Sequence, residues 1–221
     1  MNGQIDLNQV AQGGSTPVQL LLLLTLVTLL PGILMTVTAF PRILMVLGFV
    51  RNALGTPTMP PNQILVGISV FLSLFVMGPT LSKVNDEAIK PYRAHEITQA
   101  QAFERGLEPI RTFMFKQTRD TDLGLFLKLA KQERPKTRAD VPTQVLIPAF
   151  ILSELKTAFQ IGFLIFLPFL IIDMVVASTL MSMGMMMLPP VMISLPFKIL
   201  LFVLVDGWDL VVKGLVNSFH P

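Results

Sequence analysis

The chain has 221 residues, of which 52% are hydrophobic and only 14% are charged, whereas a soluble domain carries about 25% charged residues. This composition indicates a membrane protein. The net charge of +3 is too small and too dispersed to favour nucleic-acid binding, and the absence of cysteine excludes disulfides and Cys-based zinc sites.

The charged residues are concentrated in the middle of the chain. Residues 83–140 hold 21 of the 31 Lys, Arg, Asp and Glu residues, and long stretches on either side hold none, as candidate membrane spans should. We therefore expect four parts: a polar N-terminal tail (1–17), a first apolar helical hairpin (18–82), a helical extramembrane domain (83–142) and a second apolar helical hairpin (143–221).

The first apolar block, residues 18–50, is too long for one straight span, and we expect kinks at Pro31-Gly32 and Pro41-Arg42. The turn-rich connector 52–62 leads to a second span, from Gln63 to about Leu81, which is predicted to end near Gly78-Pro79.

No basic residue precedes Arg42, so the N-terminal tail is not the first part of a signal peptide. A mature chain after signal removal would have this pattern, and a native start without a signal is the alternative. The positive-inside rule places the N-terminus outside the cytoplasm and the connector inside it. Two spans then lead to a periplasmic 83–142 domain, with helices broken at Pro91 and Pro109.

The second hairpin is predicted to have one helix from about Val145 to Met183, with Pro168 inside it, and another from about Val191 to Ser218. The loop between them contains Gly184, three consecutive methionines (Met185, Met186 and Met187) and a double proline, Pro189-Pro190. No alternating strand pattern is present. We expect an all-α, integral membrane-type fold of long kinked helices in two apolar hairpins with a small helical extramembrane insertion.

Ionisable residues interrupt the second hairpin, where each needs a partner or a wet cavity. They are Glu154, Lys156, Asp173, Lys198, Asp206 and Asp209. Glu154 and Lys156 lie on different sides of a helix, so they cannot pair with each other. We predict that Glu154 pairs with Lys198, within the hairpin or between copies, and that Lys156, Asp173 and Asp206 are further buried polar groups. Asp206 and Asp209 can instead reach a headgroup layer.

No pattern in the sequence indicates catalysis. HExxH and P-loop motifs are missing, and His95 and His220 have no partner at ligand spacing. We expect no catalytic residue, no metal and no cofactor, and thus no enzyme.

Two long stretches, "PAFILSELKTAFQIGFLIFLPFLIID" (148–173) and "LPFKILLFVLVDGW" (195–208), resemble the signatures of the FliP family of flagellar type III export gates. Residues 51–79 are similar to the second-helix region of the same family and favour its flagellar branch. The resemblance covers roughly residues 18–218.

The resemblance implies a multi-copy, pore-like gate in the bacterial inner membrane at the flagellar basal body. Such a gate is a pentamer joined by FliR and several copies of FliQ, with FlhA and FlhB nearby, and it passes unfolded flagellar proteins. It also implies that the methionine-rich loop is a deformable gasket and that Glu154 and Lys198 form a salt bridge between subunits.

Methionine is unbranched and flexible, so a ring of Met185–Met187 loops could close around nothing or around a passing chain. The alternatives are a small secondary transporter or proton channel that uses the intramembrane Glu, Lys and Asp residues, and a purely structural scaffold.

Overall fold

The computed structural model describes residues 21, 24, 25, 28, 32, 35–132, 137–138, 140–185 and 187–219. The chain divides into two units, residues 1–36 and residues 37–221. The described residues of the first unit are helical. The predicted tail and the predicted kink at Pro31 lie outside the described residues, and the predicted domain boundaries stay predictions.

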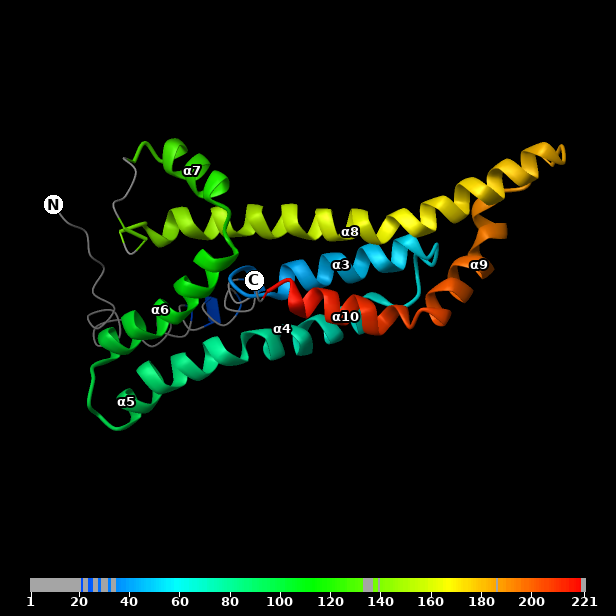
Figure 1. Cartoon of the computed structure of the whole chain (residues 1–221). Coiled ribbons are helices and arrows are strands. Elements are labelled where there is room, and N and C mark those ends of the chain that lie inside the picture. The colour runs from blue at the N-terminus through cyan, green and yellow to red at the C-terminus, as the bar shows by residue number, and fades with distance from the viewer. Residues whose placement is uncertain are drawn as a thin grey trace. The chain divides into compact units, whose positions relative to one another are not determined.

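The second unit is built from helices, and the described part of the chain contains no strand, which confirms the all-α prediction. In chain order the elements are α3 (Phe40–Ala53), α4 (Asn62–Val84), the π-helical turn η1 (Asn85–Ile89), α5 (Lys90–Arg93), α6 (Gln99–Gln117), α7 (Asp120–Leu129), α8 (Thr143–Ser182), α9 (Pro190–Leu204) and α10 (Gly207–Asn217) (Figure 1).

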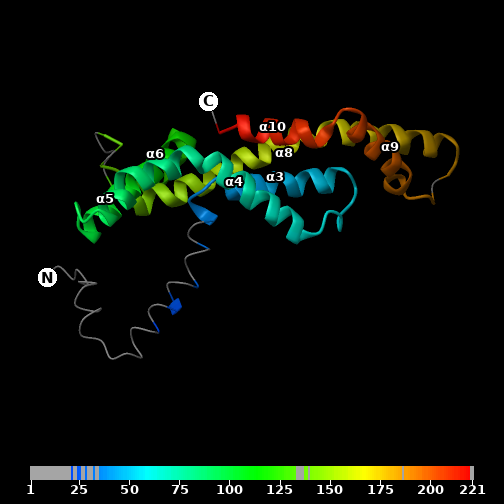
Figure 2. The same cartoon turned by 90° about the horizontal axis from the view of Figure 1, so that it is seen from below.

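Within this unit, α3 packs against both α8 and α4 (Figure 1). Helix α6 contacts α4 and α8 at the end where α5 and α7 also lie, and α7 packs on α8. Helix α9 turns back along the end of α8, and α10 follows it towards the C-terminus (Figure 2). This unit thus forms a helical body from which the α8–α9 hairpin extends.

The core is centred on the contact between α3 and α8. On α3, Ile43, Val46, Leu47 and Val50 recur at helical spacing, and each is at most 1% exposed. Phe150 of α8 is fully buried against them. Because these residues occupy one face of α3, they orient the other side chains of that helix, including Arg42.

Several prolines lie inside helices, and two sequence predictions are therefore wrong. Helix α4 does not end near Gly78-Pro79 but continues through Pro79 to Val84, and α6 is not broken at Pro109. Proline removes one backbone hydrogen bond, and packing of the flanking turns against other helices outweighs that loss. The chain is also helical through Pro91 and as far as Arg93, and the turn before this proline widens into η1.

The returning arm of the second hairpin is two helices rather than the single helix predicted from Val191 to Ser218. The break lies at Asp206, whose φ of 51° is left-handed. Gly207 follows, and a Cβ on it would lie 2.3 Å from the Phe202 ring, so only glycine permits this close approach.

Within the residues that the structure describes, two helical segments are long and apolar enough to cross a membrane. Residues 62–93 have a mean hydropathy of 2.2 in their most apolar window, and residues 143–182 have 2.4. Helix α9 is apolar but shorter. These segments agree with the predicted membrane-type fold.

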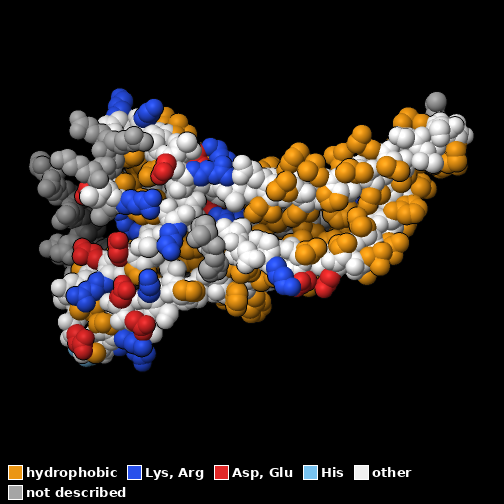
Figure 3. All heavy atoms as spheres, in the orientation of Figure 1, with side chains coloured by type: hydrophobic (Ala, Val, Ile, Leu, Met, Phe, Trp, Pro, Cys, Tyr) orange, Lys and Arg blue, Asp and Glu red, His pale blue; other side chains and the backbone are white. Residues whose placement is uncertain are grey.

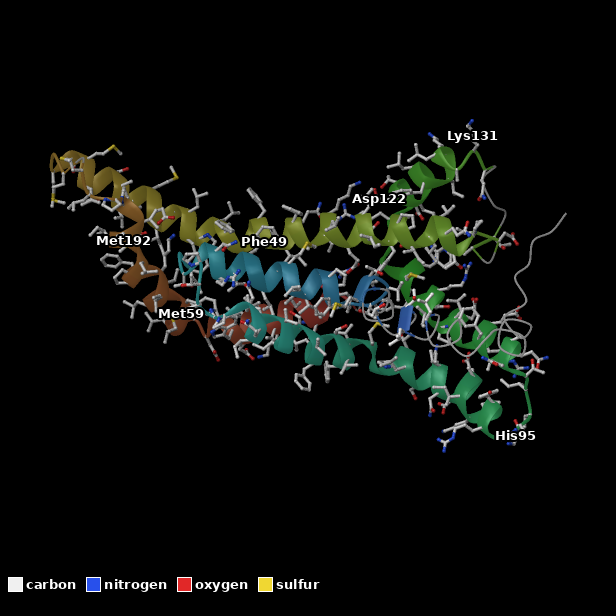
Figure 4. All side chains as sticks on the ribbon, turned by 180° about the vertical axis from the view of Figure 1, so that it is seen from behind. Phe49, Met59, His95, Asp122, Lys131 and Met192 are labelled. Atoms are coloured by element: carbon white, nitrogen blue, oxygen red, sulfur yellow. The ribbon has the colours of Figure 1, made fainter. Side chains whose placement is uncertain are left out.

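Gly162 of α8 provides a test of the α3–α8 contact, because a Cβ there would lie 2.4 Å from Cδ2 of Phe49 on α3. Phe49 also packs edge-to-face against Phe159, with ring centroids 5.1 Å apart (Figure 4). Gly162→Ala should lower the free energy of unfolding by about 1–3 kcal/mol, measured by thermal unfolding in detergent. Gly48→Ala on α3 meets no atom within 4 Å and is the control, and equal effects of the two substitutions would contradict this reading.

Candidate functional site at the tip of the α8–α9 hairpin

The loop between α8 and α9 begins with a glycine-terminated helix end. Gly184 has a φ of 76°, its N–H donates to the Met181 carbonyl at 3.0 Å, and Met185 N–H donates to the Leu180 carbonyl at 3.0 Å. Pro189 precedes α9 and Pro190 is its first residue, where a missing N–H costs nothing. The predicted turn residues therefore have the expected local roles.

The methionine side chains at this tip are uncovered in the chain. Met187 is 98% exposed and Met185 is 43% exposed, while Met186 lies outside the described residues. Exposed apolar side chains that gather in one place mark a surface that a partner or a membrane covers. The tip is therefore a candidate contact point rather than part of the core of the chain.

The apolar surface extends from the tip along both arms (Figure 3). The exposed apolar residues include Phe159, Phe163, Leu164, Leu167, Ile171, Met174, Val175 and Met181 of α8 and Val191, Met192, Phe197, Leu200, Val203 and Leu204 of α9. On the face shown in Figure 3, most of the charged side chains gather instead at the opposite end, over α5, α6 and α7. A surface of this kind is covered by lipid or by other proteins.

Among the ion pairs of the described residues, the most buried one joins α3 to α8. The Arg42 side chain is 2% exposed and the Glu154 side chain is 0% exposed. Arg42 Nε donates to Glu154 Oε2 at 2.9 Å, and Arg42 Nη2 donates to Glu154 Oε1. This two-point arrangement fixes the guanidinium plane.

The remaining donors of Arg42 hold α6 and the C-terminal turn. Nη2 donates to Gln117 Oε1 at 3.0 Å, and Nη1 donates to the carbonyl oxygen of Ser218 at 2.9 Å. The guanidinium carbon also lies 3.8 Å from the centre of the Phe219 ring. One side chain therefore ties α3, α6, α8 and the end of α10 together.

A second ion pair docks α7 on α8, between Asp122 and Lys156 (Figure 4). Ser153 Oγ donates to Asp122 Oδ2 at 2.8 Å. Burial opposes the charge of Asp122, but hydrogen bonds from Lys156 and Ser153 and the charge of Lys156 outweigh it. They hold the pKa of the carboxyl below its ordinary value.

The third ion pair joins the two arms of the hairpin. Lys198 Nζ of α9 donates to Asp173 Oδ2 of α8 at 2.6 Å, and Ser194 Oγ donates to the other oxygen, Oδ1. The Lys198 side chain is 4% exposed and that of Asp173 is 34% exposed.

These contacts change the expected pairing of Glu154 and Lys198. Within the chain the two are not partners, because Glu154 pairs with Arg42 and Lys198 pairs with Asp173. Pairing between copies stays a prediction, and it would require the fully buried Glu154 to become accessible. Of the other expected buried groups, Asp173 is partly buried, whereas Lys156 and Asp206 are exposed in the single chain, so their burial within an assembly stays a prediction. Lys156 lies on α8, where it pairs with Asp122, and Asp206 lies at the break between α9 and α10.

Sequence reasoning missed Arg42, Gln117 and Asp122 as members of these clusters. Arg42 did carry a signal, because it is the only charged residue between 7 and 50 and Glu154 needed a cation. Asp122 carried none, since it lies in a segment rich in exposed charges. Among the residues that the structure describes, no group of three or more His, Cys, Asp or Glu side chains could hold a metal.

The fold and its uncovered apolar hairpin define an all-α, membrane-type protein. The FliP family model matches residues 23–215, and the chain belongs to this family. The chain is 60% identical over 205 residues to the flagellar biosynthetic protein FliP of Bacillus subtilis, covering 93% of each chain.

Other relatives carry the same name. Identity to the flagellar biosynthetic protein FliP of Pectobacterium carotovorum is 56% over 209 residues, covering 95% of this chain and 81% of the relative. Identity to that of Aquifex aeolicus is 50% over 205 residues, covering 92% and 86%. The resemblance noted in the sequence is thus confirmed at the level of the family.

Glu154→Gln tests the buried pair, because it keeps the shape of the side chain and leaves Arg42 without a counter-charge. The free energy of unfolding should fall by about 3–5 kcal/mol, measured by thermal or denaturant unfolding. Asp209→Asn, which breaks the exposed pair with Lys213, is the control and should have little effect.

Exchanging charges at Glu154 and Lys198 distinguishes pairing within the chain from pairing between copies. If Arg42 is the partner that matters, exchanging the charges of Glu154 and Lys198 together should assemble no better than either single exchange. Rescue of assembly by the double exchange would instead support the bridge between copies.

Asp122→Asn should lower the unfolding temperature at neutral pH, because Lys156 and Ser153 lose the carboxylate that they contact. The folded-state pKa is lowered, so this contribution is complete above the unfolded-state pKa of about 3.9 and is lost as the pH falls through the folded-state value. The difference between wild type and variant should stay constant from about pH 8 to pH 5 and shrink below about pH 4. A difference that disappears between neutral pH and pH 5 would contradict this assignment, and the exposed Asp120→Asn on the same helix is the control.

Proposed function

We propose that the chain is a pore-forming subunit of the flagellar type III export gate, through which unfolded flagellar proteins cross the inner membrane. The observation that carries the proposal is the exposed methionine tip on an apolar hairpin, in a chain of the FliP family. Relatives that are called flagellar biosynthetic protein FliP align with nearly the whole length of this chain.

The uncovered apolar arms support assembly with further subunits. Side chains such as Phe163 and Val203 are 63% and 68% exposed, and neighbouring subunits would shelter them together with lipid. The proposed assembly is a pentamer with FliQ and FliR, close to FlhA and FlhB, with the charged 83–142 domain on the periplasmic side. Native mass spectrometry of the complex extracted with its neighbours tests the copy number, and a stable monomer would argue against it.

In such an assembly the loops from several copies would meet near one axis. Methionine side chains have three rotatable bonds and a polarisable sulfur, so they pack against irregular partners without a fixed geometry. A ring of them would close against ions when empty and deform around a passing chain. Gly184 and Pro189-Pro190 fix where each loop leaves its helices, while the methionine side chains stay free to adapt.

The ionisable groups of the hairpin support a structural role rather than proton or solute transport. Glu154, Lys156 and Asp173 each have an oppositely charged partner in the chain. A proton carrier needs a group that titrates during transport, and the fully buried Glu154, held in an ion pair by Arg42, resists that change. A gate subunit of this kind has no catalytic step and is not an enzyme.

Replacing Met185, Met186 and Met187 by alanine together should raise ion leakage several-fold across membranes that contain the assembled gate. Alanine removes the flexible part of each side chain and leaves a wider opening. Conductance of vesicles or of whole cells measures the leak, and export of flagellar subunits is followed in parallel.

Met59→Ala is the matched control, because Met59 is 69% exposed but lies in the connector between α3 and α4, away from the tip (Figure 4). It should leave conductance unchanged. A triple variant that exports normally and leaks no more than wild type would refute the gasket.

A further inference from the structure

One polar cluster links the two arms of the hairpin. Asp173 lies on α8, and Ser194 and Lys198 lie on α9 one helical turn apart. Both oxygens of the Asp173 carboxylate are used, one by each partner. Among the described residues, no other side-chain hydrogen bond or ion pair joins these two helices.

Between this cluster and the tip, the contact between the arms is apolar. An open groove of about 500 Å³ runs between them, lined by residues that include Ile171, Val175, Thr179, Met183, Ile193 and Phe197. Apolar contacts attract without a preferred direction, so they do not by themselves fix the distance between the arms. The cluster is therefore the last directional constraint before the methionine loop.

The cluster is also supported by the body of the chain. Gly55, in the connector between α3 and α4, lies so close that a Cβ on it would be 3.5 Å from Leu195 Cδ1 and 4.0 Å from Lys198 Nζ. Arg51 holds this connector in shape by donating to Asn62 Oδ1 at 2.6 Å. The cluster therefore links the two arms by hydrogen bonds at the point where they leave the helical body.

Burial makes the cluster of Asp173, Ser194 and Lys198 difficult to disrupt. Ser194 is fully buried and the Lys198 side chain is 4% exposed, so loss of the Asp173 charge would leave an ammonium group without a counter-charge in an apolar setting. Two hydrogen bonds to one carboxylate fix its orientation as well as its distance. Both the separation and the register of the arms follow from that geometry.

We propose that Asp173, Ser194 and Lys198 are positioning residues that set the separation of the hairpin arms and thereby hold the methionine tip in place. The effect of this positioning on the gate rests on the proposed function. The separation of the arms is a property of the chain itself, so it can be measured without an assay of protein export.

The chain contains no cysteine, so spin labels can be introduced at chosen pairs of positions. Met181→Cys and Met192→Cys place labels on α8 and α9 on the tip side of the cluster, at positions 59% and 66% exposed. Phe71→Cys and Phe163→Cys, at 75% and 63% exposure, report on α4 against α8. Pulsed dipolar spectroscopy on the full chain, diluted with unlabelled chain in nanodiscs, gives the distance distribution for each pair.

Asp173→Asn should lengthen and broaden the distribution between the labels on α8 and α9 and leave the α4–α8 pair unchanged. Asp173→Glu keeps the charge and should recover much of the narrow distribution, and Ser194→Ala should give a smaller shift than Asp173→Asn. Asp209→Asn, which breaks an exposed pair on α10, should change neither distribution.

Two results would overturn the proposal. One is an unchanged α8–α9 distribution in both Asp173→Asn and Ser194→Ala. The other is equal broadening of both label pairs in each variant, which would show that the cluster supports the whole fold rather than the position of the arms.

Ion leakage of the same variants separates this inference from the proposed function. A broader α8–α9 distribution with unchanged leakage would support the positioning role and count against the gasket. Increased leakage with an unchanged distribution would support a gate and exclude Asp173 as its positioning residue.

Discussion

The packing of α3 on α8 depends on one buried charge pair, Arg42 with Glu154, because this pair joins the two helices and its remaining hydrogen bonds reach α6 and the C-terminal turn. Taking both charges out of water is expensive, and a partner for every donor is what makes their burial tolerable. Glu154, Gln117 and Ser218 accept from Arg42, so the guanidinium fixes how α6, α8 and the C-terminal turn meet α3. The apolar face of α3 supplies the attraction between helices, and the ion pair selects one register among the many that apolar packing alone would allow.

The two halves of α8 make different contacts. Its first half is packed on α3, α6 and α7 and carries Glu154 and Lys156, which join it to α3 and α7. Its second half leaves the body, is linked to Ser194 and Lys198 of α9 through Asp173, and presents apolar side chains outward. A rigid base that carries an uncovered apolar arm is suited to a subunit completed by its neighbours. The same arm places the flexible methionine side chains of the tip far from the helical body (Figure 1).

Proline has opposite consequences at different places in this fold. Pro189 and Pro190 end one helix arm and start the next, as their local chemistry predicts, whereas Pro79 and Pro109 lie within helices that continue. The difference is tertiary. Helices α4 and α6 pack against each other, and that packing outweighs one missing hydrogen bond. The break in the returning arm lies instead at Asp206, where a left-handed residue and the packing of Gly207 on Phe202 stop the helix.

The sequence by itself determined the all-α class, the two apolar blocks, the charged segment between them, the turn at Gly184 and the family, because each depends on local composition, short-range periodicity or long motifs. Tertiary structure decided which charges meet. Glu154 is 112 residues from Arg42 and Asp122 is 34 residues from Lys156, and no local rule links residues so far apart. The sequence showed that Glu154 and Lys198 each needed a partner. Only the packing of α3 on α8, and of α9 back along α8, determined that those partners within the chain are Arg42 and Asp173.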